Sequence, residues 1–203
     1  MILSILKEAT ALKVKDLYEI RWHGRGGMGT VTAALLVADA IVRKGKFVQA
    51  IPEFGPERRG APVRAYNRIS EKSIRLRSGI TEPDMVVVID SGFVDSPEVL
   101  DGLARDGIIL VNSVLPAEDL RKRIKLNGRK LFSVDASGIA LSSFGRNIPN
   151  TPIVGAVSKV LGDLLPLSSL EEAITARFGL KGEKIVNENL AALRRAYEEV
   201  KEI

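Results

Sequence analysis

Apolar residues along the chain follow two alternating periods. Short apolar runs rich in β-branched or aromatic residues alternate with longer segments in which apolar residues recur every three or four positions. The short runs predict strands, and the longer segments predict helices. We predict strands at 17–22, 47–51, 63–70, 85–90, 108–113 and 130–136. We predict helices at 30–44, 96–107, 116–128, 151–165, 169–179 and 183–202.

The order of these elements predicts the fold class. Strands and helices alternate up to residue 136, and from about 137 only helices are predicted. This order is typical of an α/β protein, here a Rossmann-like, mostly parallel sheet with flanking helices and a helical C-terminal segment. The segment 63–77 is a candidate for an added antiparallel edge. We expect one domain, 1–203, with an α/β core at 17–136 and a helical part at 137–203.

Residues 20–29 read IRWHGRGGMG and form a glycine-rich loop between a predicted strand and a predicted helix. Gly24, Gly26 and Gly29 fit the pattern G-x-G-x-x-G, in which free N–H groups at the helix N-terminus face a phosphate. The alternative is a turn whose glycines only pack against neighbouring elements. A dinucleotide site would also need an acidic residue about 20 residues beyond the loop. Glu53 stands near that position.

The segment PEFGPERRGAP follows the second predicted strand and is unusual for a loop. Prolines and glycines restrict its path, while Glu57, Arg58 and Arg59 keep it charged. Adjacent arginines suit a phosphate better than a ribose hydroxyl. A solvated loop pair or a contact with another subunit explains the two arginines equally well.

Three further positions carry candidate chemistry. His23 has no nucleophile or second acid paired with it by motif, so we favour a role in anchoring the loop. Asp90 ends a predicted central strand, where it either binds a ligand hydroxyl or amine, or caps a helix and orders a loop. In GRNIPNTPIVGA, Asn150 or Thr151 is expected to cap a helix that has Pro152 in its first turn. None of these patterns is a catalytic constellation.

Composition excludes several classes of site. The chain has no cysteine and a single histidine, which excludes disulfides, thiolate nucleophiles, cysteine-ligated clusters and histidine-rich metal sites. A net charge of +5, 5% aromatic residues and no long Lys/Arg run do not indicate nucleic-acid binding. No stretch approaches about 18 uninterrupted apolar residues, so no membrane span is predicted. Charges come too early at the N-terminus for a secretory signal, and we expect a cytoplasmic protein.

Taken together, the segments RWHGRGGMG, AIPEFGPERRGAPVRAYNRIS and NIPNTPIVGA closely resemble the gamma subunit of 2-oxoacid:ferredoxin oxidoreductases. The resemblance is strongest to the pyruvate and 2-oxoisovalerate members, and it runs in order from Tyr18 to the terminal helix. Met28 is a departure, since the family usually has glutamine there. The resemblance implies a holoenzyme that oxidatively decarboxylates a 2-oxoacid with coenzyme A (CoA) and reduces ferredoxin. It implies thiamine diphosphate between alpha and beta subunits, and iron–sulfur clusters in the delta and beta subunits.

The resemblance also implies what this chain contributes. It would hold no cofactor alone, form one wall of the CoA site and assemble with the alpha, beta and delta subunits. The residues expected to form the glycine loop of that wall are Gly24, Arg25, Gly26, Gly27 and Gly29, with Glu57, Arg58 and Arg59 for phosphate or interface contacts. Two alternatives stay open: an autonomous NAD(P)-dependent dehydrogenase built on the glycine pattern, and a scaffold in which the glycines only pack.

Overall fold

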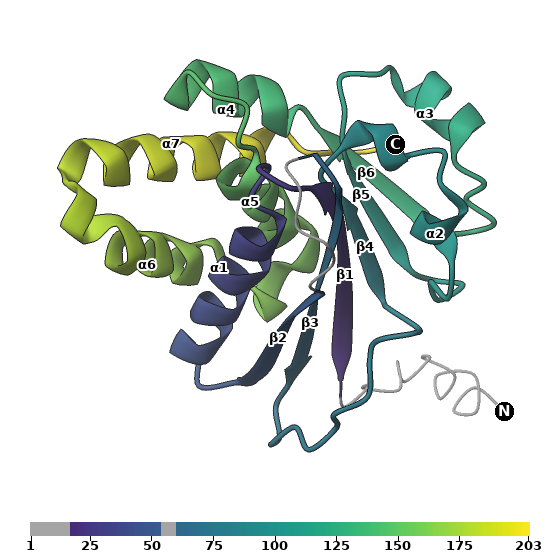
Figure 1. Cartoon of the computed structure of the whole chain (residues 1–203), viewed down its shortest axis with the longest axis horizontal. Helices are drawn as coiled ribbons and strands as arrows, with labels where there is room; N and C mark the ends of the chain where they lie inside the picture. The colour runs from purple at the N-terminus through teal and green to yellow at the C-terminus, as the bar shows by residue number, and fades with distance from the viewer. Residues whose placement is uncertain (1–16, 54–59) are drawn as a thin grey trace, which may run out of the picture.

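The computed structural model describes residues 17–53 and 60–203. Seven strands form one sheet with the order β2-β3-β1-β4-β5-β6-β7 (Figure 1). The strands are β1 (Tyr18–Arg25), β2 (Phe47–Glu53), β3 (Pro62–Ser70), β4 (Met85–Val88), β5 (Ile108–Asn112), β6 (Lys130–Val134) and β7 (Lys201–Glu202). The predicted α/β fold class is confirmed.

The sheet is parallel in its centre and antiparallel at both ends. Strands β1, β4, β5 and β6 pair in parallel, β3 runs antiparallel between β1 and β2, and β7 runs antiparallel to β6. The predicted antiparallel strand within 63–77 exists, but it lies inside the sheet, and β2 is the edge. The expectation that strands stop near residue 137 was wrong, because β7 returns to the sheet after the last helix.

Helices cover both faces of the sheet. They are α1 (Thr30–Arg43), α2 (Pro97–Leu100), α3 (Ala117–Arg123), α4 (Ala136–Phe144), α5 (Asn150–Leu161), α6 (Leu167–Phe178) and α7 (Glu183–Glu199), with short 3₁₀ turns such as η1 (Ser91–Phe93). Helices α1 and α4 to α7 lie on one side of the sheet, and α2 and α3 on the other (Figure 1). Helix α4 was not predicted. Within the described ranges, no helix is long and apolar enough to cross a bilayer.

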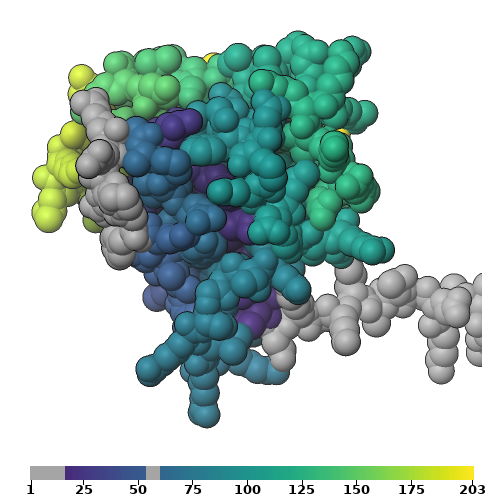
Figure 2. Space-filling model, turned by 45° about the vertical axis from the view of Figure 1, so that its right-hand side comes forward, coloured from purple at the N-terminus to yellow at the C-terminus, as the bar shows by residue number. Residues whose placement is uncertain are grey.

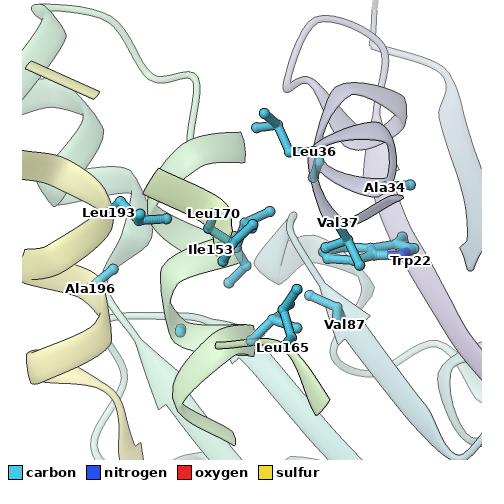
Figure 3. Close-up of a cluster of buried hydrophobic side chains, with 14 of the residues drawn as sticks. Trp22, Ala34, Leu36, Val37, Val87, Ile153, Leu165, Leu170, Leu193 and Ala196 are labelled. Atoms are coloured by element: carbon cyan, nitrogen blue, oxygen red, sulfur yellow. The ribbon is translucent and has the colours of Figure 1, made fainter. Parts of the chain in front are cut away.

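The larger hydrophobic core lies between the sheet and the layer that contains α1, α5, α6 and α7. Figure 3 shows Trp22 of β1 beside Val37 of α1, with Ile153, Leu165 and Leu170 in the same cluster. The indole Nε1 of Trp22 donates a hydrogen bond to Asn67 Oδ1 at 2.8 Å. Each of these side chains is fully buried. A pairing of this kind is what allows a polar side chain to lie in an apolar interior.

The other face of β1, β2 and β3 is largely polar, because most of the alternate side chains on that face are charged or hydrogen-bonding, with Phe47 and Ile51 of β2 as apolar exceptions. Arg68 is 1% exposed, and its guanidinium donates to Glu19 Oε1 at 2.7 Å, to Gln49 Oε1 at 3.1 Å and to the Ser78 carbonyl at 3.2 Å. The strand at 63–70 was predicted as half-exposed. Arg64 and Tyr66 are partly exposed, as predicted, whereas Asn67, Arg68 and Ser70 are buried.

Candidate functional site

The glycine loop joins β1 to α1 at the carboxyl end of the parallel strands. Gly27 has φ 98° and Gly29 has φ 78°, a left-handed conformation that glycine adopts at little cost. Gly29 is the N-cap of α1, makes no side-chain cap bond, and no acidic residue follows in the first turn. The first N–H groups of a helix have no partner within the helix, and they favour negative charge. The N-terminus of α1 is therefore suited to bind an anion.

Glycines 24 and 29 are also required by packing. A Cβ at position 24 would lie 2.1 Å from Thr30 Oγ1, and one at position 29 would lie 2.9 Å from the Asn150 side chain. Thr30 Oγ1 is buried and has no hydrogen-bond partner among the residues that the structure describes. Close packing thus accounts for both Gly24 and Gly29, and the positive φ of Gly29 also favours glycine there.

Arg25 connects the glycine loop to the end of β4. Its Nε donates to the Asp90 carboxylate, its Nη1 donates to the Gly60 carbonyl at 3.2 Å, and its guanidinium lies 4.7 Å from the centre of the Phe93 ring. Asp90 also accepts from the Gly92 N–H at 3.0 Å and so caps η1. The contacts of Asp90 with Arg25 and the Gly92 N–H therefore match the expected role of capping a helix and ordering a loop.

The segment rich in proline and arginine returns to the glycine loop. The Gly26 N–H donates to the Ala61 carbonyl at 2.9 Å, and the Gly60 N–H donates to the Gly26 carbonyl at 3.2 Å. The glycine loop and the end of the PEFGPERRGAP segment therefore meet at the carboxyl end of β1. Glu57, Arg58 and Arg59 lie outside the described residues, so their expected contacts stay a prediction.

A cavity of about 320 Å³ opens beside the end of β1. Figure 2 shows a line of purple β1 atoms at the surface, between the blue atoms of β2 and β3 and the teal atoms of later segments. The cavity wall combines backbone, charged and aromatic groups. It is lined by His23, Gly24, Glu53, Pro62, Val63, Arg64, Phe93, Ser96 and Glu98.

His23 lies at this cavity wall and is 3% exposed. Its Nε2 accepts a hydrogen bond from Arg21 Nε at 3.0 Å, so the imidazole is neutral and carries its proton on Nδ1. Burial, followed by the charges of Arg21 and Arg64, lowers the pKa of His23 to about 4. Arg21 in turn donates to the carbonyls of α2 and its flanking residues. The contact that the His23 imidazole makes is with Arg21 of β1, so its expected loop-anchoring role stays a prediction.

Glu53, the expected ribose-binding acid, is already engaged. Its carboxylate accepts from the Tyr66 hydroxyl at 2.6 Å and from Arg64 Nη2 at 3.0 Å. Burial raises the pKa of Glu53, but the Tyr66 hydrogen bond and the Arg64 charge lower it overall. Burial and the bond to Glu53 raise the pKa of Tyr66 to about 12. Strand β3 also separates β2 from β1, whereas a dinucleotide fold places the acidic residue on the strand beside β1.

The entry to α5 differs from its prediction. Helix α5 begins at Asn150 with Pro149 as its N-cap, and no side chain caps it. Thr151 Oγ1 instead donates to Asn189 Oδ1 of α7 at 2.8 Å. Pro152 does lie in the first turn. Asn150 and Thr151 therefore contact Gly29 and α7, respectively, and do not cap the N-terminus of α5.

Within the described part of the chain, no group of three His, Cys, Asp or Glu side chains could hold a metal ion. Gly24, Arg25, Gly26, Gly27 and Gly29 lie at the end of β1 and in the turn before α1, and their expected ligand contacts stay a prediction. Sequence reasoning missed the cavity-lining side chains of Arg64, Phe93, Ser96 and Glu98, and the positioning role of Arg21. The period of two in β1, which places Arg21 and His23 on one face, was the available signal.

Comparison with known proteins agrees with this geometry. The chain is 49% identical over 188 residues to pyruvate synthase subunit PorC of Thermotoga maritima, covering 92% of this chain and 96% of that protein. The crystal structure of the Thermotoga maritima subunit superposes with a TM-score of 0.82 at 45% identity, covering 93% of this chain and 99% of that one.

Two further comparisons extend the picture. The gamma subunit common to pyruvate and ketoisovalerate oxidoreductases of Pyrococcus furiosus is 48% identical over 183 residues, covering 90% of this chain and 96% of that protein. A 2-oxoglutarate:ferredoxin oxidoreductase of Magnetococcus marinus shares the fold, with a TM-score of 0.74 at 20% identity, covering 91% of this chain and 31% of that one. Residues 19–199 match the pyruvate ferredoxin/flavodoxin oxidoreductase family. Since this match spans nearly the whole chain, the protein belongs to the pyruvate ferredoxin/flavodoxin oxidoreductase family.

Proposed function

We propose that this chain is the gamma subunit of a pyruvate:ferredoxin oxidoreductase, and that it forms one wall of the site for CoA. In the holoenzyme, thiamine diphosphate and iron–sulfur clusters on the alpha, beta and delta subunits supply decarboxylation and electron transfer to ferredoxin. The residues of this chain bind and orient a phosphate of CoA. The similarity to the pyruvate synthase subunit of Thermotoga maritima supports the identity of the enzyme.

The open N-terminus of α1 carries the proposal for CoA. Its first turn has no acidic residue and its N-cap has no side chain, so backbone N–H groups are free to donate to an anion. Gly26 and Gly27 add a backbone that a phosphate can approach closely, and the Arg25 guanidinium, paired with Asp90, is 41% exposed beside them. Gly60, next to Arg59 in the chain, is hydrogen-bonded to this loop. Arg58 and Arg59 are the proposed further phosphate contacts.

A second candidate concerns the substrate. The relative in Pyrococcus furiosus is a gamma subunit common to pyruvate and ketoisovalerate oxidoreductases. A shared subunit is consistent with a wall that contacts CoA, the co-substrate common to both reactions, rather than the 2-oxoacid. We therefore propose that the same chain could also serve a 2-oxoisovalerate enzyme. The alternative of an NAD(P)-dependent dehydrogenase needs Glu53 to bind a ribose hydroxyl, but the Glu53 carboxylate already accepts hydrogen bonds from Tyr66 and Arg64.

The substitution Thr32→Glu tests the phosphate site. Thr32 is half-buried in the first turn of α1, where a carboxylate stabilises the free helix by about 0.3–1 kcal/mol. The same charge would repel a bound phosphate. Because like charges about 4 Å apart cost about 1 kcal/mol even in water, the KM of the holoenzyme for CoA should rise about fivefold or more. The matched control, Thr32→Gln, keeps the side-chain length without the charge and should leave the KM unchanged.

The readouts separate binding from folding. Thr32→Glu should raise the KM for CoA while the thermal stability of the chain stays the same or increases. Arg58→Ala with Arg59→Ala should raise the same KM roughly tenfold, since a lost charge-assisted bond costs about 1.5–3 kcal/mol. A holoenzyme with wild-type KM for CoA in both variants would refute the CoA role and leave the glycine loop as a packing device.

A further inference from the structure

The end of the molecule opposite the glycine loop carries exposed apolar side chains among unpaired cations. The C-terminal end of α1, the start of β2 and the loop after β3 meet there: Phe47 pairs with Ser70 in the ladder, and Gln49 Nε2 donates to the Leu76 carbonyl at 3.0 Å. The loop after β3 projects from the lower end of the molecule (Figure 2). We call this region the basal surface, defined by Val42, Arg43, Lys44, Phe47, Arg75, Leu76 and Arg77.

The apolar side chains of the basal surface are strongly exposed to solvent. Val42 is 60% exposed, Phe47 is 46% exposed and Leu76 is 47% exposed. Single exposed apolar residues are ordinary, but Phe47 and Leu76 lie toward the same face of the sheet, where Gln49 bonds to the Leu76 carbonyl, and Val42 lies on the α1 side of this end. Several exposed apolar side chains at one end of a molecule indicate an interaction site. Val42 and Arg43 also border a shallow groove formed with Ala173 and Ala176 of α6, which extends the surface sideways.

The charges of the basal surface are almost all of one sign. Arg43, Lys44, Arg75 and Arg77 are exposed, and none forms an ion pair within the described part of the chain. Of the acids in the loop after β3, Glu71 lies 2.7 Å from Lys46, Asp84 accepts from the Glu19 N–H at 2.8 Å, and Glu82 lies five residues beyond Arg77. The C-terminal dipole of α1 explains the position of Arg43 and Lys44. No helix end explains the two arginines that flank Leu76.

We propose that the basal surface docks onto an acidic surface of another subunit in the same oxidoreductase. This inference rests on the proposed function for the existence of such a subunit. Arginine and aromatic residues are enriched where proteins meet, and opposite charges across an interface set its specificity and rate of association. A second copy of this chain fits poorly, because a two-fold contact would bring like charges face to face. A nucleic acid would match the cations and leave the apolar side chains without partners.

Charge reversal in the assembled enzyme tests this inference. Arg75→Glu with Arg77→Glu should weaken binding of the full chain to the other subunits about tenfold or more, with a smaller dependence on salt. The matched control is Arg121→Glu with Lys125→Glu, which changes the charge equally. Arg121 lies on α3 and Lys125 just after it, and both are exposed and form no ion pair with the residues that the structure describes. Binding of this control should stay within about twofold of wild type. Dissociation constants would be measured by titrating labelled chain with the purified remaining subunits at several salt concentrations.

A second pair of variants tests the apolar part without changing charge. Leu76→Ser should weaken binding, while Leu141→Ser, at a comparably exposed leucine on α4, should not. Binding of Arg75→Glu/Arg77→Glu and Leu76→Ser at wild-type strength would overturn the proposal. So would self-association of the free chain, in light scattering, that these variants abolish. The KM for CoA reports separately on the glycine loop, so a failure of docking and a failure of the CoA site are distinguishable.

Discussion

Gly155 lies where α5 and α7 approach most closely, and its replacement by alanine should destabilise the protein. A Cβ at this position would lie 2.1 Å from the backbone oxygen of Leu193, whereas ordinary van der Waals contact begins at 3.4 Å. The backbone of α7 must therefore move by about 1 Å. Overpacking of this kind costs about 1–3 kcal/mol. Alanine also gains about 1 kcal/mol of helix propensity over glycine, so the measured loss should be about 0–2 kcal/mol.

The assay is equilibrium unfolding of the free chain in urea, followed by circular dichroism. In a separate thermal unfolding experiment, the midpoint temperature should fall by about 2–4 °C for each kcal/mol of lost stability. Gly179→Ala is the matched control, because Gly179 has helical φ and ψ, and a Cβ added there would have no neighbouring atom within 4 Å. That control should be neutral or stabilising by about 0.4–1 kcal/mol. Equal stability of Gly155→Ala and Gly179→Ala would refute the close approach of α5 and α7.

Two further predictions concern buried charge and pH. Glu19→Ala leaves the Arg68 guanidinium, which is 1% exposed, without its carboxylate partner. The free energy of unfolding in urea should therefore fall by about 3 kcal/mol. Replacing both partners, by Glu19→Leu with Arg68→Met, should restore part of this loss. Since the pKa of His23 is lowered from 6.5 to about 4, the unfolded chain binds a proton first, and stability should fall by about 3 kcal/mol as pH decreases from 6.5 to 4. His23→Gln should lack this component, and identical pH profiles of the two proteins would contradict the assignment.

The sequence predicted the alternation of elements because periodicity reports how each segment meets the core. The run at 85–90 gave β4, buried on both faces, and the helical spacing after residue 30 gave α1. Gly45, with φ 72°, lies just beyond the end of α1. Patterns local to one segment were therefore sufficient for the type of each of these elements.

Pairing and partners were harder to predict, because they depend on residues far apart in the chain. No local signal places β3 between β2 and β1, and β7 is a short strand that forms only because β6 offers it an edge. Helix α4, ASGIALSSF, mixes small polar and apolar residues without a clear stripe. At the site, the glycine pattern correctly predicted a loop between β1 and α1. The engagement of Glu53 by Tyr66 and Arg64 required the register of β2 against β3.

Helix α1 joins the two ends of the molecule in a way that has a mechanical consequence. Its 14 residues run from the glycine loop to the basal surface, a span of about 21 Å. The helix packs against β2, β3 and α6, and a close-packed helix of this kind is expected to move together with its sheet. A tilt of about 5° at the basal end would therefore shift the glycine loop by about 2 Å, over half the length of a hydrogen bond. How this chain is seated at one end would thus change the alignment of the glycine loop at the other.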